Sequence, residues 1–566
     1  MRKTLYIFFA VLITMSMLLT ACKPGATGAA PAAAADLPVL RVNFISYPDM
    51  LDPQKSSFMN EISHLRRIYE GLTILDDNLK VIPGAAETWE YNADATEVVY
   101  TLREGLVYSD GGILNAERFA YALKRNIDPA TAGEYAYITD DVKGAVDWRS
   151  ADLTTATEEQ LQALKDAVAV QALTMDDQPC TGYDQPECRK IKIGLAQPAP
   201  YFDYIMGLWV IFPVREEIIT ADPETWWVSA AGHIGNGPFN LESLEQNERA
   251  TLVPNPKYWG GQATYKLEHH YITDSAVAFE AYKNNELDIF PFGVEDLAAI
   301  ENDPELNAQK HLFPGTCTFG AMFHHEKPPF DDPKVREAFA YAIDRDAWVA
   351  DVLKGVGIPT LTWIPQGVPG HVDGETRWGY DIEKARQAIA DSTYGSADKL
   401  PEISLTFSDN PRNRTRFEWL ASKWSEAFGI EIKLNPVEPT TYSSLTKDRA
   451  TAPQVYILGW CSDYPDPQNW MSTYWKTGAM AERFAFGNAE LDALLAKADT
   501  TVDYDERIKL NQEAQDMLIG LIPTAIIWNQ AESFLVKPWV KGIHQTAQDT
   551  DFPGSNNVLS ITIEEH

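Results

Sequence analysis

The motifs that would mark an enzyme are missing or incomplete. The sequence has no Gly-x-Ser-x-Gly elbow for a serine nucleophile and no Gly-x-x-x-x-Gly-Lys phosphate loop. Gly235-Asn236-Gly237 is followed by proline, which breaks a dinucleotide fingerprint. The histidine clusters, His269-His270 and His324-His325-Glu326, lack the i, i+4 spacing that places two imidazoles on one helical face. These observations favour binding over catalysis, and no enzyme activity, metal or cofactor is predicted.

Acidic residues give the chain a large negative charge. They outnumber basic residues by 81 to 47, for a net charge of −34. Such a charge repels phosphate backbones and anionic lipid headgroups, so we expect no nucleic-acid partner. With 81 acidic residues, paired carboxylates of the glycosidase type arise by coincidence. Aromatic residues make up 11%, including 16 Trp, and these rings could fill the core or wall a large pocket.

The first 22 residues predict export and lipid anchoring. Arg2 and Lys3 precede an apolar run over residues 5–19, which is shorter than the roughly 20 residues of a membrane-spanning helix. Leu19-Thr20-Ala21-Cys22 resembles the bacterial lipobox, whose cysteine is acylated and becomes the first residue of the mature protein. In the alternative, an ordinary secretory signal, Cys22 is incidental. The Gly-, Pro- and Ala-rich residues that follow predict a flexible tether over 23–37.

The other four cysteines predict two disulfides. An exported protein folds in an oxidising compartment, and Cys180, Cys188, Cys317 and Cys461 allow three pairings. Cys180 and Cys188 flank a short, turn-rich loop that proximity would close, which leaves Cys317 with Cys461. No pair has the C-x-x-C spacing of a zinc site.

The elements that must position any site alternate along the chain. Apolar periodicity predicts strands over 39–45, 98–102 and 190–195, and helices over 62–72, 116–126 and 155–170. A further mixture of helices and strands is expected over 276–284, 334–343, 382–391, 403–407, 417–428, 430–434, 490–498 and 505–519. This interleaving predicts an α/β or α+β protein. The 35 prolines are spread over connections, which fits two lobes joined by several crossings.

A series of short sequence blocks runs in order from about residue 39 to the C-terminus. They include residues 68–72 (IYEGL), 82–89 (IPGAAETW), 100–105 (YTLREG), 109–111 (SDG), 235–239 (GNGPF), 255–260 (NPKYWG), 335–339 (VREAF), 342–345 (AIDR) and 459–467 (GWCSDYPDP). In this order they resemble solute-binding protein family 5, the oligopeptide- and dipeptide-binding proteins of ABC importers.

The resemblance implies a two-lobed α/β fold, like that of periplasmic binding proteins, with a hinge. Lobe I would comprise residues 38–75, 191–310 and 525–566, with an inserted subdomain over 76–190. Lobe II would span 311–524. The lobes of such proteins close over a ligand, and a membrane permease then recognises the closed form.

The resemblance also assigns site residues. Asp463 falls where peptide binders of the family carry the aspartate that pairs with the peptide's α-ammonium group; its alternative role is that of a turn residue. Trp460 would wall the pocket or pack in the core, and Tyr464 of the same block is a further candidate ligand contact. Trp475 is a candidate ligand contact by its residue type, as an aromatic side chain that could line a pocket. The resemblance also pairs Cys461 with Cys317, in agreement with the cysteine count.

The sequence leaves two points open: which arginines bind a peptide carboxylate, and which class of ligand is bound. Arg412, Arg414 and Arg416 are candidates for the carboxylate, with a solvated loop as the alternative. Trp363, Trp470 and Trp475 could pack against peptide side chains or stack on sugar rings.

The sequence therefore predicts a lipid-anchored, monomeric receptor at the outer face of the bacterial cytoplasmic membrane or in the periplasm. We expect it to capture short peptides and deliver them to the permease of an ABC importer. An oligosaccharide receptor on the same scaffold is the main alternative. A secreted hydrolase and a structural surface lipoprotein without a small ligand are the others.

Overall fold

One mixed sheet runs through the computed structural model, which describes residues 37–44 and 46–566. Its strands follow the order β15-β14-β16-β12-β17-β11-β1-β10-β9-β8, and β13 pairs with β17 beside this path. The strands are β1 (Val39–Asn43), β8 (Phe239–Glu245), β9 (Arg249–Pro254), β10 (Lys266–His270), β11 (Ile289–Pro291), β12 (Lys310–Phe323), β13 (Ile358–Pro359), β14 (Ile403–Ser408), β15 (Ile432–Val437), β16 (Val455–Cys461) and β17 (Thr524–Val536).

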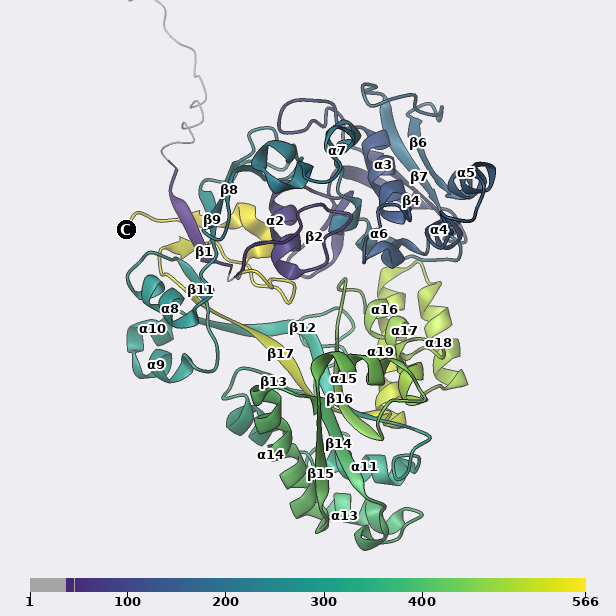
Figure 1. The fold of residues 1–566 in the computed structure, drawn as a ribbon, viewed down its shortest axis with the longest axis vertical. Helices are drawn as coiled ribbons and strands as arrows, with labels where there is room; N and C mark the ends of the chain where they lie inside the picture. Colours follow the sequence, from purple (N-terminus) through teal and green to yellow (C-terminus); the bar gives the residue numbers. More distant parts are fainter. Residues whose placement is uncertain (1–36, 45) are drawn as a thin grey trace, which may run out of the picture. The chain divides into compact units, whose positions relative to one another are not determined.

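Two long antiparallel strands, β12 and β17, connect the halves of this sheet (Figure 1). At one end β17 pairs with β11, and at the other β12 pairs with β16. The register of β12 on β17 shifts between Pro314 and Thr318. Separate hydrophobic clusters cover the two halves, which form the two lobes. The predicted mixed α/β class is confirmed.

Lobe I carries a second sheet in addition to its half of the large one. This antiparallel sheet has the order β4-β5-β7-β6, and α3 packs against β6 and β7. Its strands are β4 (Ala86–Tyr91), β5 (Glu97–Leu102), β6 (Val170–Thr174) and β7 (Cys188–Gly194), and the lobe adds the short pairs β2 (Thr73–Leu75) with β3 (Val81–Pro83) and β18 (Val540–Lys541) with β19 (Thr562–Ile563). Its helices are α2 (Met59–Ile68), α3 (Ala116–Ile127), α4 (Ala145–Arg149), α5 (Glu158–Ala167), α6 (Phe202–Ile205), α7 (Glu216–Ala221), α8 (Ser275–Lys283), α9 (Leu297–Asn302) and α10 (Pro304–Ala308).

Lobe II surrounds its half of the sheet with helices. They are α11 (Pro333–Tyr341), α12 (Arg345–Ala347), α13 (Ile382–Asp391), α14 (Pro411–Phe428), α15 (Pro439–Lys447), α16 (Pro467–Trp470), α17 (Ser472–Trp475), α18 (Ala489–Asp499) and α19 (Tyr504–Leu521). One cluster packs α11, α13 and α14 on the sheet, and a second, rich in aromatic rings, lies around α16–α19.

The turn between β2 and β3 reaches from lobe I into the second cluster of lobe II. Leu79, at its tip, is 1% exposed and belongs to the cluster that contains Trp363 and Leu518. The hydroxyl of Tyr204 donates a hydrogen bond to the Leu79 carbonyl at 3.2 Å. The ammonium group of Lys80 lies 4.8 Å from the centre of the Tyr504 ring. This turn therefore ties the two lobes together by apolar and polar contacts.

Most of the predicted elements are present, with errors at their ends. The helix expected over 155–170 is wrong at both ends, because α5 spans Glu158–Ala167 and Val170 already begins β6. The helix expected over 62–72 ends at Ile68, where Tyr69 turns to an extended conformation. A Cβ at Gly71 would lie 2.5 Å from the Met206 carbonyl oxygen, so glycine allows the chain after α2 to pass close to residue 206.

Both predicted disulfides are confirmed. Cys180 bonds to Cys188 across their loop. Cys317 bonds to Cys461 and joins neighbouring positions of β12 and β16. The second bond therefore fixes the end of β16, from which the turn with Asp463 departs.

The predicted signal peptide with Cys22 and the tether over 23–37 lie outside the described residues, apart from Leu37. Among the helices that the structure does describe, none is both long enough and apolar enough to cross a membrane.

Candidate functional site

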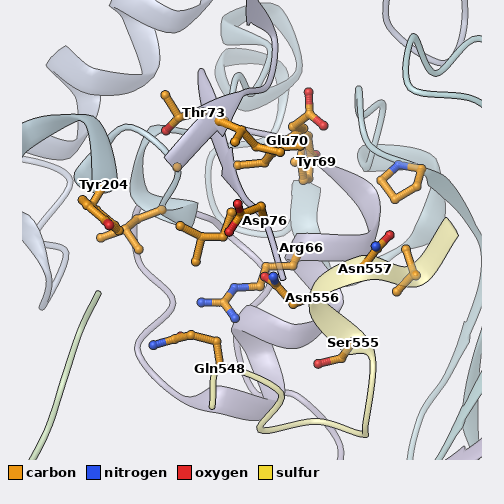
Figure 2. Close-up of a pocket in the computed structure, with 18 of the residues that line it drawn as sticks. Arg66, Tyr69, Glu70, Thr73, Asp76, Tyr204, Gln548, Ser555, Asn556 and Asn557 are labelled. Atoms are coloured by element: carbon orange, nitrogen blue, oxygen red, sulfur yellow. The ribbon is translucent and has the colours of Figure 1, made fainter. Parts of the chain in front are cut away.

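A large cavity lies where residues 463–465 of lobe II meet the wall of lobe I. It holds about 1340 Å³ of space outside the protein atoms, including solvent at its mouth. Lobe I lines it with the end of α2 and the β2 segment, with residues around Tyr204, and with residues 548–559 near the C-terminus (Figure 2). The site thus collects side chains from distant parts of the sequence.

Asp463 sits in a turn that is held in place from both sides. Its backbone N–H donates to Oδ1 of Asn469 at 3.2 Å, and the Trp460 indole N–H donates to the same oxygen at 3.1 Å. Asp466 begins α16 by accepting a hydrogen bond from the Gln468 N–H at 2.9 Å. Asp466 also forms a fully buried ion pair with Arg507 of α19. These bonds fix the direction in which the Asp463 carboxylate points.

The Asp463 carboxylate has no cationic partner within the part of the chain that the structure describes. Its side chain accepts a long hydrogen bond, 3.5 Å, from the Asn469 amide. Burial raises the pKa of Asp463 to about 6, against the opposing effect of that bond. Burial, followed by the charge of Asp463, also raises the pKa of Tyr135 to about 12 and that of Tyr137 in the same direction. An unneutralised carboxylate beside tyrosine rings can bind a cationic group.

The aromatic residues predicted near Asp463 occupy different environments. Tyr464 lines the cavity, and its ring centre lies 6.4 Å from those of Tyr201 and Tyr204 in lobe I. Its hydroxyl donates to the Gln468 side chain at 2.6 Å. Trp460 is half-buried and packs edge-on against Tyr474. Tyr464 therefore contacts both lobes at the edge of the cavity.

Trp475 is fully buried and does not line the cavity. It packs in one cluster with Trp363 and Trp470, and none of the three indoles has any exposed surface. The Trp363 indole N–H donates to the Trp470 carbonyl at 2.9 Å. In this structure these rings present no face to a peptide or to a sugar, and they stabilise the core of lobe II.

Glu70, a member of the sequence block at 68–72, forms part of the lobe I wall. It accepts hydrogen bonds from the Tyr258 hydroxyl and, at 2.6 Å, from the Trp259 indole N–H. Burial raises the pKa of Glu70 to about 7, although both bonds favour the carboxylate. The Arg103 guanidinium stacks 3.6 Å from the Trp259 ring. Glu70, Tyr258, Trp259 and Arg103 thus form a connected set of polar and aromatic contacts in the lobe I wall of the cavity.

Three further cavity residues, Arg66, Gln548 and Asn556, were missed by the sequence analysis. Arg66 lies two residues before the first sequence block, so a search for arginines near the blocks could have found it. No sequence signal links Gln548 and Asn556 to a site, because only the fold brings the C-terminal segment to α2.

The arginines considered for a carboxylate lie elsewhere. Arg412, Arg414 and Arg416 lie in the first turns of the helix α14 and not in a loop, but Arg412 and Arg414 are exposed to solvent as the alternative expected. The helix begins early because the Asn410 side chain accepts from the Asn413 N–H at 2.9 Å. Arg414 is paired with Asp409, and none of the three arginines lines the cavity at Asp463.

One cluster with metal-ligand atoms occurs among the described residues. Glu117 lies beside Cys180 and Cys188. Both sulfur atoms are bonded to each other, so the disulfide leaves no thiolate for a metal. The cluster supports no metal site in this oxidised form.

Comparison with known proteins identifies the scaffold. Residues 80–482 match the family model described as bacterial extracellular solute-binding proteins, family 5 Middle. The oligopeptide-binding protein OppA of Bacillus subtilis is 24% identical over 94% of this chain and 95% of its own length. The probable deoxycholate-binding periplasmic protein YgiS of Escherichia coli is 27% identical over 91% and 94%. The unliganded open form of the murein tripeptide-binding protein MppA superimposes with a TM-score of 0.80 at 23% identity, covering 94% of this chain and 98% of MppA. The chain belongs to family 5 of the bacterial extracellular solute-binding proteins.

Proposed function

We propose that this protein is a receptor for short peptides that serves an ABC importer. The observation that carries the proposal is the Asp463 carboxylate, which lines the cavity without a cationic partner among the residues described. OppA is named for oligopeptides and MppA for a tripeptide, which supports the same ligand class here. The family resemblance supports delivery to a permease.

The chemistry of Asp463 suits a peptide's N-terminus. An ammonium group donates up to three hydrogen bonds, and charge-assisted bonds contribute about 1.5–3 kcal/mol each when water is excluded. The bond from Asn469 is long, so both carboxylate oxygens keep capacity for a ligand. Closure of the lobes would strengthen the interaction by removing water. No bond-breaking step is involved.

Isothermal titration with defined tri- to pentapeptides tests the proposal. We expect binding to wild-type protein, at least tenfold weaker binding of the same peptides after N-acetylation, and a similar loss in Asp463→Asn. Asp166→Asn is the matched control, because Asp166 is exposed on α5 and far in sequence from the cavity residues. If none of the peptides binds to the wild-type protein, the proposal of a peptide receptor is wrong. Equal losses for free and acetylated peptides in Asp463→Asn would remove Asp463 from its ammonium role.

The cellular placement is part of the same proposal. We infer that Cys22 is acylated after removal of residues 1–21, so that residues 23–37 tether a monomeric receptor to the outer face of the cytoplasmic membrane. The sequence of residues 2–22 supports this inference. Mass spectrometry of the mature N-terminus tests it, and Cys22→Ser should release the protein from the membrane fraction. An unmodified Cys22 in the mature protein would contradict it.

A further inference from the structure

One side of the cavity gathers hydrogen-bond donors that have no acceptor. Arg66, in the last turn of α2, extends its guanidinium into the cavity (Figure 2), and it has no hydrogen bond or ion pair with any residue of the described chain. Its neighbour Arg67 differs, because it binds the Asp551 carboxylate at 2.7 Å and the Ser555 carbonyl at 2.6 Å. Arg67 therefore supports the wall, whereas Arg66 remains available.

Two amide groups add to these donors. The Nε2 of Gln548 and the Nδ2 of Asn556 are buried, and both lack an acceptor within the described residues. Gln548 is only 7% exposed, and both residues line the same cavity as Arg66. Leaving a buried amide donor unpaired is unfavourable, because the group has lost its hydrogen bonds to water. Both amide donors are therefore left for an acceptor supplied from outside the chain.

The segment that carries the amides is rigidly held. Asp549 accepts hydrogen bonds from the N–H groups of Thr546, Gly554 and Asn556, at 2.7, 3.0 and 2.7 Å, and from the Ser555 hydroxyl at 3.2 Å. These bonds close the loop around one carboxylate. The positions of the Gln548 and Asn556 backbones are therefore set before any ligand arrives.

The carboxylates near Arg66 are engaged with other groups. Asp551 is paired with Arg67, and Asp549 is surrounded by its own loop. Asp76 accepts from backbone N–H groups of its turn, and Asp77 binds His544. Glu70 accepts from Tyr258 and Trp259. Arg66 is thus a cation whose neighbouring acids are occupied.

We propose that Arg66, Gln548 and Asn556 form a carboxylate subsite in lobe I, which binds the negatively charged group of the peptide while Asp463 binds its ammonium group. The inference rests on the proposed function. Guanidinium N–H groups match the two oxygens of a carboxylate, and amide N–H groups complete its coordination. The carboxylate comes either from the peptide's C-terminus or from an acidic side chain. A zwitterionic ligand would satisfy the unpaired charges of both lobes.

Paired peptides test the subsite without any mutation. Isothermal titration compares a binding peptide with its C-terminal amide, and we expect wild-type protein to bind the acid at least tenfold more tightly. A third peptide, amidated but ending in Glu, distinguishes the two sources of the carboxylate. Recovery of tight binding by this peptide assigns the subsite to any carboxylate, and no recovery assigns it to the C-terminus. Equal affinity for the acid, the amide and the Glu peptide overturns the inference.

Variants then identify the residues. In Arg66→Met the ratio of acid to amide affinity should fall to about one. Binding of the C-terminally amidated peptide to Arg66→Met also shows that the variant is folded. Gln548→Leu should lower the ratio in part, and Arg66→Lys should retain some of it. Arg249→Met is the matched control, since Arg249 is exposed on β9 and contacts Glu245. A ratio that persists in Arg66→Met, or that falls equally in Arg249→Met, overturns the inference. Failure of wild-type protein to bind any peptide is a different result, because it ends the proposed function as well.

Discussion

The pH dependence of peptide affinity should report the ionisation of Asp463. In the free protein burial raises the pKa of this carboxyl to about 6. A bound ammonium group favours the charged form and lowers the pKa below that value. Affinity is therefore full only well above this pKa, and it is lost as the pH falls through the pKa of the free protein.

The size of the effect follows from the fraction of ionised carboxylate. With a pKa of about 6, about nine tenths of Asp463 is ionised at pH 7 and about one tenth at pH 5. Peptide affinity should therefore fall about tenfold between these two values. It should fall again above about pH 8, where the peptide's α-amino group loses its proton. A plot of peptide affinity against pH should therefore decrease at both acidic and basic pH, with its maximum near neutral pH.

The assay is titration of trialanine at half-unit steps from pH 4.5 to 9 in buffers of constant ionic strength. Trialanine carries no side chain that ionises in this range. Asp463→Asn should bind trialanine more weakly, and its affinity should no longer decrease at acidic pH. Glu70, with a pKa of about 7, is the other cavity group that could ionise here, and Glu70→Gln measures its share. An unchanged acidic side in Asp463→Asn would refute the reasoning.

Two further predictions concern stability. Trp475→Ala should lower the free energy of unfolding by about 3–5 kcal/mol, measured by urea denaturation, because a fully buried indole is removed. Trp460→Ala, at a half-buried position, is the comparison. An equal or larger loss in Trp460→Ala would contradict a core role for Trp475. Replacing Cys317 and Cys461 by serine should lower the free energy of unfolding by about 5 kcal/mol, because this disulfide closes a loop with a sequence separation of 144. Loss of the Cys180–Cys188 disulfide, with a separation of 8, should lower it by about 2.5 kcal/mol. A larger loss for the shorter loop in thermal unfolding would contradict the loop-entropy argument.

The fold was predictable to the extent that local patterns decide it. The strand expected over 98–102 and the helix expected over 116–126 follow local patterns, and both are present, as β5 and α3. Errors occur where a cap decides the boundary, as at Asn410, which starts α14 well before the apolar stripe that begins at Phe417. A cap depends on one side chain, and periodicity over a window does not detect it.

The site was predictable only where a sequence block carried it. Asp463 was found because it lies in such a block, and it does line the cavity. Trp475 was selected by residue type, but aromatic rings serve cores and pockets equally well, and its burial depends on the packing of α16–α19. Arg66, Gln548 and Asn556 come from segments almost 500 residues apart, and their proximity is a property of the folded chain alone.

The turn at Leu79 completes the aromatic cluster of lobe II, so that this cluster is incomplete without lobe I. A recombinant fragment with residues 311–524 alone would lack Leu79 and Ala547, and both are buried members of its aromatic cluster. The fragment would expose that apolar surface to water and would be prone to aggregate. Biosensors built from this receptor should therefore receive their fluorescent modules at exposed loops of the intact chain, because separated halves would have to be produced together to fold.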